Sequence, residues 1–107
     1  MIFVYFGKIS GRMANVKFIV RGNKNPAEIY SRFYRGKQFD FTAKSGFLIN
    51  PKFWDKRKES IKNMIDSQPF RFLNNKLPKL NEKVINSFNI DYNDGKVINK
   101  QWLDTVV

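Results

Sequence analysis

Three stretches in which apolar residues alternate with more polar ones constrain the fold of this chain more than any other feature. Val16, Phe18 and Val20 lie at alternate positions, and the same period of two returns over residues 28–34 and 38–44. The connections at 21–26 and 35–37 contain Gly, Asn or Pro, residues that favour turns. Because successive side chains of a strand point to opposite faces, the pattern predicts a three-stranded antiparallel sheet within residues 15–44.

The two faces of this predicted sheet differ in chemistry. One face is apolar and consists of Val16, Phe18, Val20, Ile29, Phe33, Phe39 and Phe41. The other is basic, aromatic and polar and consists of Lys17, Arg21, Tyr30, Arg32, Gln38, Thr42 and Lys44. Antiparallel sheets commonly bury one face and leave the other in water. We therefore expect the apolar face to be covered and the basic face to be exposed.

The second half of the chain contains a helical pattern that can cover the apolar face of the sheet. Apolar residues at helical spacing form one stripe of an amphipathic helix: Leu73, Leu77, Leu80, Val84 and Phe88. Gly95 is a typical stop, and Pro78 leaves the helix start open between residues 70 and 78. Asn99 is predicted to cap a second helix containing Trp102 and Leu103. The predicted fold class is α+β, a three-stranded antiparallel sheet packed against one main α-helix.

Residues 45–72 follow no single period. We interpret Phe47–Ile49 as a short separate strand, and Phe53 and Trp54 as core residues rather than base-stacking platforms. Lys56–Lys58 is a basic cluster without an assigned position.

The charge of the chain indicates a polyanionic partner. Its 107 residues, a length typical of one domain, include 20 Lys and Arg against nine Asp and Glu, a net charge of +11. Residues 1–62 hold 14 of these basic residues and four of the acidic ones, a net charge of +10. This asymmetry predicts that the first part faces the partner and that the second part is scaffold.

Two residue types are missing, and their absence weighs against catalysis. The chain has no Cys and no His, which excludes disulfides, thiolate zinc sites, Cys nucleophiles and the commonest general base. We predict no catalytic residue, no metal site and no cofactor. The longest apolar run, Ile2–Phe6, is far shorter than the roughly 20 residues of a membrane-spanning helix, and we expect a cytoplasmic protein.

The basic face is the candidate binding site. The major groove of duplex DNA is about 12 Å wide and admits a β-ribbon, and an Arg held on a strand can address guanine O6 and N7, which suits Arg32. Lys24, Arg35 and Lys37 would flank the groove from turns. The predicted DNA-binding set is Lys17, Arg21, Lys24, Tyr30, Arg32, Arg35, Lys37, Gln38, Thr42 and Lys44. The alternative for this face is a solvated surface kept soluble by its charge.

Other functions remain open at this point. Aromatic residues near Arg32 and Arg35 leave an RNA-binding or ribosome-associated module as the second hypothesis. A protein-interaction module that recruits an acidic partner is the third. An enzyme comes last.

Short motifs spread over residues 13–107 resemble one family. They are Met13–Arg21, Asn25–Tyr30, Phe39–Thr42, Ser45–Gly46, Ile49–Asp55, Asn74–Leu77, Asp94–Gly95 and Trp102–Leu103. Together they resemble the N-terminal region of tyrosine-recombinase integrases of phages and conjugative transposons, and Ile49–Asp55 is the most telling of them.

This resemblance implies an arm-type DNA-binding domain whose sheet enters the major groove of arm sites. It implies sequence-specific binding to duplex DNA, other integrase protomers as partners in the full-length protein, and cleavage by a Tyr nucleophile in a separate catalytic domain. The fragment alone would be a monomeric binding module with no membrane partner. We expect a leader at 1–12 outside the native domain, with Ile2–Phe6 as an extra strand as the alternative. The arm-type domain would span 13–95, and 96–107 would be a linker and the start of a core-binding helical domain.

Overall fold

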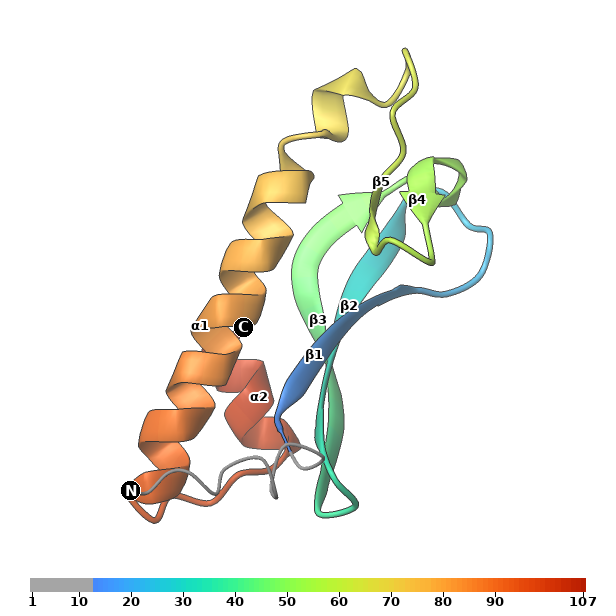
Figure 1. Ribbon diagram of the computed structural model, residues 1–107. Coiled ribbons are helices and arrows are strands. Elements are labelled where there is room, and N and C mark those ends of the chain that lie inside the picture. The colour runs from blue at the N-terminus through green and yellow to red at the C-terminus, as the bar shows by residue number, and fades with distance from the viewer. Residues whose placement is uncertain (1–12) are drawn as a thin grey trace.

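A computed structural model describes residues 13–107, so the leader and the alternative strand predicted at 1–12 lie outside the described residues. The sheet consists of β1 (Asn15–Val20), β2 (Ala27–Arg35) and β3 (Phe39–Ile49), antiparallel and in the order β1-β2-β3. The long helix α1 (Leu73–Asn93) runs along one side of the sheet, and the shorter α2 (Lys100–Val106) lies between α1 and the strands (Figure 1). The predicted α+β fold class is confirmed.

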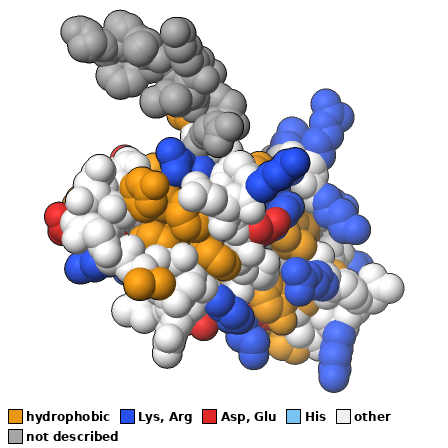
Figure 2. All heavy atoms as spheres, turned by 90° about the horizontal axis from the view of Figure 1, so that it is seen from below, with side chains coloured by type: hydrophobic (Ala, Val, Ile, Leu, Met, Phe, Trp, Pro, Cys, Tyr) orange, Lys and Arg blue, Asp and Glu red, His pale blue; other side chains and the backbone are white. Residues whose placement is uncertain are grey.

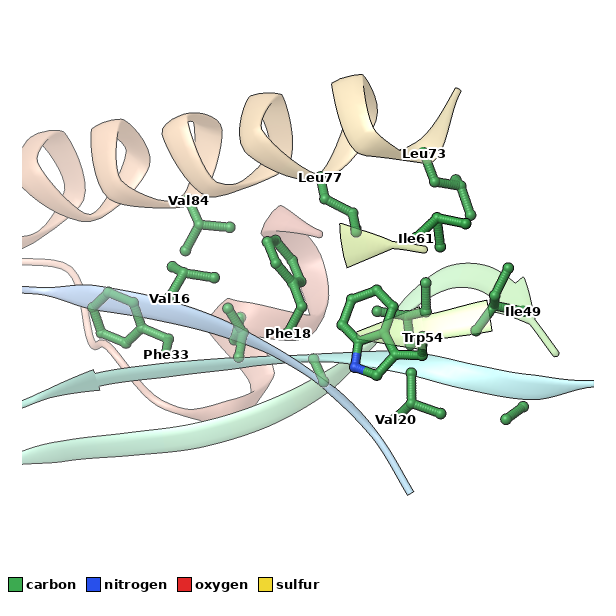
Figure 3. Close-up of a cluster of buried hydrophobic side chains, with 14 of the residues drawn as sticks. Val16, Phe18, Val20, Phe33, Ile49, Trp54, Ile61, Leu73, Leu77 and Val84 are labelled. Carbon is green, nitrogen blue, oxygen red and sulfur yellow. The ribbon is translucent and has the colours of Figure 1, made fainter. Parts of the chain in front are cut away.

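The core lies between the sheet and the helices. The predicted apolar face is turned inward: Val16, Phe18, Val20, Ile29 and Phe33 are buried, and Phe39 and Phe41 are partly buried against them. Leu77 and Val84 of α1 point toward these strand side chains (Figure 3). Phe33 is the centre of an aromatic cluster, with its ring centroid 5.0 Å from that of Phe88 and 5.3 Å from that of Trp102.

A small second sheet closes one end of this core. After η2 (Pro51–Phe53), β4 (Trp54–Asp55) and β5 (Ser60–Ile61) form a two-stranded hairpin, and η3 (Gln68–Phe70) leads into α1. Phe53 and Trp54 are buried, as predicted. The side chain of Asn74 in α1 accepts from the backbone N–H of Ile61 at 2.7 Å and donates to its carbonyl at 3.2 Å, which ties the hairpin to the helix.

β3 is longer than the sequence pattern indicates. The segment 47–49, predicted as a separate strand, continues β3 after a register shift opposite the stretch from Glu28 to Tyr30. Gly46 adopts a φ of 90°, a conformation that favours glycine, and its N–H donates to the Glu28 carboxylate at 2.8 Å. A bulge at this position therefore bends β3 rather than ending it.

The C-terminal residues belong to the same core. Asn99 caps α2 as predicted, since its side-chain oxygen accepts from the N–H of Trp102 at 2.9 Å. Trp102 and Leu103 are buried, and Trp102 donates from Nε1 to Asp91 of α1 at 2.9 Å. The core of the described residues includes α2, because Trp102 fills the space beside Phe33 and Phe88. That residues 96–107 are a linker and the start of a core-binding helical domain stays a prediction.

Candidate nucleic-acid interface

The side of the sheet turned away from α1 is the candidate interface, here called the outer face. It presents alternate residues of the strands in cross-strand rows set by the register. The rows are Asn15–Tyr34–Asp40, Lys17–Arg32–Thr42 and Ile19–Tyr30–Lys44. Neighbouring side chains in a row stand about 5 Å apart, so basic, aromatic and hydroxyl groups from the three strands form one surface.

Half of the predicted set lies on the outer face itself, namely Lys17, Tyr30, Arg32, Thr42 and Lys44. Arg21, directly after β1, joins them because its guanidinium carbon lies 4.9 Å from the centroid of the Tyr30 ring. Stacking of this kind holds the long side chain over the sheet while its N–H groups stay available to a partner.

The other predicted residues lie elsewhere. Lys24 is exposed in the β1–β2 loop, and Lys37 and Gln38 are exposed in the β2–β3 turn, so Gln38 is not a strand residue. Arg35 shares the parity of Phe33 and therefore lies on the inner side of the sheet. Its guanidinium carbon is 5.6 Å from the Phe88 ring centroid and 5.4 Å from that of Tyr92, so the structure separates Arg35 from the outer face.

Arg32 is held by two neighbours. Its Nε donates to Asp40 Oδ1 at 2.9 Å and its Nη2 donates to Asp40 Oδ2 at 2.7 Å, while its guanidinium carbon lies 4.9 Å from the Tyr34 ring centroid. The hydrogen bonds from Arg32 lower the pKa of the Asp40 carboxyl, and those same bonds raise the pKa of the guanidinium. Both groups therefore stay charged at neutral pH.

A groove continues the outer face beyond the edge of β1. It has a volume of about 520 Å³ and lies between β1 and the β4–β5 hairpin, with Lys17, Arg21, Arg32 and Lys56 among its lining residues. The Glu59 carboxylate, which also lines it, accepts from the backbone N–H of Phe18 at 2.9 Å. This hydrogen bond anchors the hairpin to the edge of β1. It also engages the carboxylate of Glu59 with the protein backbone.

The sequence pattern does not identify two residues of the candidate interface, Lys56 and Asp40. Lys56 belongs to the basic cluster Lys56–Lys58, but no local signal places that cluster beside β1. Asp40 alternates with Phe39 and Phe41, which is enough to assign it to the polar face, but its bond to Arg32 joins two strands and has no signature in one of them.

Positive charge gathers on the side of the strands. Seen from below, most of the Lys and Arg side chains in view project from the side of the molecule that the strands form (Figure 2). The acidic side chains near the outer face accept hydrogen bonds from the protein, Glu28 from Gly46 and Asp40 from Arg32. The surface left to a partner is therefore cationic and rich in hydrogen-bond donors.

Within residues 13–107, no cluster of His, Cys, Asp or Glu is suited to hold a metal ion. Over the same residues, no helix combines the length and the apolar character needed to cross a membrane. Comparison of the chain with protein-family models, curated proteins and solved structures finds no significant match.

Proposed function

We propose that the chain binds duplex DNA through its outer face, as the arm-type DNA-binding module of a tyrosine recombinase. The observation that carries the proposal is the row Lys17–Arg32–Thr42 with Arg21 and Lys44 beside it, on a sheet whose opposite face is sealed by α1 and α2. Within residues 13–107, the inner face of the strands is therefore closed to a partner and the cationic face is open. Phosphates attract such a surface, and Arg and Thr side chains can address base edges.

The dimensions of the sheet fit a groove. Three strands separated by about 4.8 Å give a backbone width of roughly 10 Å, and the major groove is about 12 Å wide. The sheet can therefore enter the groove with its strands and place Lys24 and Lys37, on the loops at its two ends, toward the phosphate walls. Single modules of this size bury on the order of 600–1,000 Å².

The test is a titration of the chain against a labelled duplex of mixed sequence at several salt concentrations. Five cations on phosphates give a slope of log K against log salt of roughly −4 to −5. Lys17→Gln with Lys44→Gln should make this slope less negative by about 1.8. Lys79→Gln with Lys83→Gln on α1 is the matched control and should leave the slope unchanged. Equal effects of the two double variants would contradict a binding site on the outer face.

RNA binding is the second candidate, and one observation favours it. Tyr30 and Tyr34 lie on the outer face of the central strand, where bases of a single strand can stack on aromatic rings. Each ring, however, is already covered by a guanidinium, Arg21 on Tyr30 and Arg32 on Tyr34. Competition between the duplex and a single-stranded RNA of the same sequence separates the candidates, and preference for RNA would reverse their order.

The recombinase part of the proposal rests on the resemblance of the short motifs, of which Ile49–Asp55 is the most telling. Asn50 accepts from the N–H of Lys52 at 3.0 Å and caps η2, Pro51 begins that turn, and Phe53 and Trp54 plug the core. The motif thus places the hairpin that borders the groove. Sequencing the gene downstream of residue 107 tests this part, because the proposal requires a frame that encodes a helical domain and a catalytic domain with a Tyr nucleophile.

A further inference from the structure

The Arg32–Asp40 pair is electrically neutral, although it lies in the middle of the basic surface. A neutral pair attracts phosphates weakly, since phosphate binding depends on net positive charge. The pair instead fixes the orientation of the guanidinium. Asp40 accepts hydrogen bonds from one edge of it, and the guanidinium carbon lies over the Tyr34 ring. Arg32 is therefore better suited to recognise a hydrogen-bonding pattern than to neutralise a phosphate.

The donors that Asp40 leaves free form a fork. A guanidinium has five N–H donors, and Asp40 takes one on Nε and one on Nη2. The remaining hydrogens are one on Nη2 and two on Nη1. These two nitrogens present parallel donors, the arrangement that guanine O6 and N7 accept side by side in the major groove.

We propose that Asp40 and Tyr34 are positioning residues that hold the Arg32 fork for one guanine of the bound duplex. This inference rests on the proposed function and names the feature of the DNA that the outer face reads. Asp40 contacts Arg32 and not the base. Its negative charge weakens phosphate binding by the outer face, so a role in phosphate binding does not explain its position. The side chains of Arg32 and Asp40 are 39% and 52% exposed, so the fork is accessible.

The experiment is a selection from a library of random duplexes with the full chain, followed by sequencing of the bound fraction. The original chain should select one position as guanine, favoured by about 5- to 150-fold over other bases. Arg32→Lys keeps the charge but lacks the fork, and should lose this preference while binding random duplex with a similar affinity. Asp40→Asn and Tyr34→Leu should reduce the preference at the same position several-fold.

Asp40→Asn separates positioning from charge. Removing a negative group from a DNA-binding face raises affinity for every sequence if the group only repels phosphate, whereas a positioning role predicts loss of guanine preference. Asp104→Asn is the matched control, because Asp104 on α2 pairs with Lys100 at 3.1 Å and its side chain is 50% exposed. That control should leave both affinity and preference unchanged, and thermal melting confirms that each variant is folded.

The outcomes distinguish the two proposals. Absence of salt-dependent duplex binding by the original chain would overturn the proposed function. Binding without a guanine preference, or a preference that survives Asp40→Asn, would overturn the positioning inference alone. Loss of the preference in both Arg32→Lys and Asp40→Asn, with random-duplex affinity kept in the first and kept or raised in the second, supports it.

Discussion

Arg32 and Arg35 lie three positions apart on β2, and strand parity gives them different environments. Arg32 is on the outer face with Asp40 and Tyr34, whereas Arg35 is on the inner side over the Phe88 and Tyr92 rings of α1. Both residues belong to the predicted DNA-binding set, Arg32 as a strand residue and Arg35 as a turn residue. Only the three-dimensional placement separates a binding role from a packing role.

Replacement by Ala should therefore lower the stability of the fold at Arg35 and the affinity for DNA at Arg32. Arg35→Ala removes a cation–π contact and should lower the free energy of unfolding by about 1 kcal/mol, with little change in duplex affinity. Arg32→Ala should lower affinity for a selected site by about 1–3 kcal/mol and change the melting temperature little. Anisotropy titration and thermal melting of both variants check this, and a loss of duplex affinity in Arg35→Ala would contradict its assignment to the inner side.

Asp91 links stability to pH at the junction of the two helices. The hydrogen bond from Trp102 Nε1, followed by Lys96, holds the pKa of the Asp91 carboxyl below its usual 3.8. A group whose pKa is lower in the folded state stabilises the fold above its unfolded pKa, and this contribution is lost as pH falls through the folded pKa.

We expect the melting temperature of the chain to fall as the pH is lowered below about 4. The fall should be smaller in Asp91→Asn, which starts from a lower melting temperature at neutral pH. Trp102→Phe, which keeps a ring but removes the donor, should also reduce the acid dependence. An acid fall of unchanged size in both variants would show that this bond is not responsible.

At the scale of elements, the β4–β5 hairpin extends the candidate site beyond the sheet. Lys56 lines the groove beside β1, together with Lys17 and Arg21, whereas Lys58 lies in the same turn and does not line the groove. Glu59 and Asn74 fix the hairpin on its two sides, to β1 and to α1. The position of the groove relative to the sheet is thus fixed, and the sugar–phosphate backbone of one DNA strand can lie in it.

Lys56→Gln should make the slope of log K against log salt less negative by about 0.9 and weaken binding to all duplex sequences alike. Lys58→Gln is the matched control from the same turn and should have a clearly smaller effect. The titrations are those used for the outer face. A larger effect of Lys58→Gln would place the phosphate strand outside the groove.

The elements that could be predicted from the sequence are those with a local period. Val16–Val20 and the stripe from Leu73 to Phe88 show their burial directly, because their spacing is fixed by strand and helix geometry. Three features depend on residues that are not neighbours in the sequence. They are the continuation of β3 past Gly46, the position of the β4–β5 hairpin, and the Arg32–Asp40 bond. For the same reason, sequence reasoning proposed the basic face but neither its groove nor its ion pair.

At the scale of the whole molecule, α2 completes the core on which the outer face depends. Trp102 contacts Phe33 of the central strand and Phe88 of α1 through their ring edges, and Leu103 is fully buried. Ile98, just before α2, is also buried. Both helices therefore cover the inner face of the sheet, and α2 follows Gly95, where the arm-type domain was predicted to end.

Ending the chain at Gly95 should then destabilise the whole fold. Burial of a large apolar side chain contributes about 1.5–3 kcal/mol, so loss of Ile98, Trp102 and Leu103 removes roughly 5–9 kcal/mol, comparable to the total stability of about 5–15 kcal/mol of a small domain. We expect the truncated chain to show no cooperative melting transition and no duplex binding. Leu103→Ala in the full chain should act in the same direction at about 2–5 kcal/mol, and Gln101→Ala, an exposed position on α2, is the control. A truncated chain that melts cooperatively near the temperature of the full one would mean that residues 96–107 serve a neighbouring domain, as the resemblance to integrases implies.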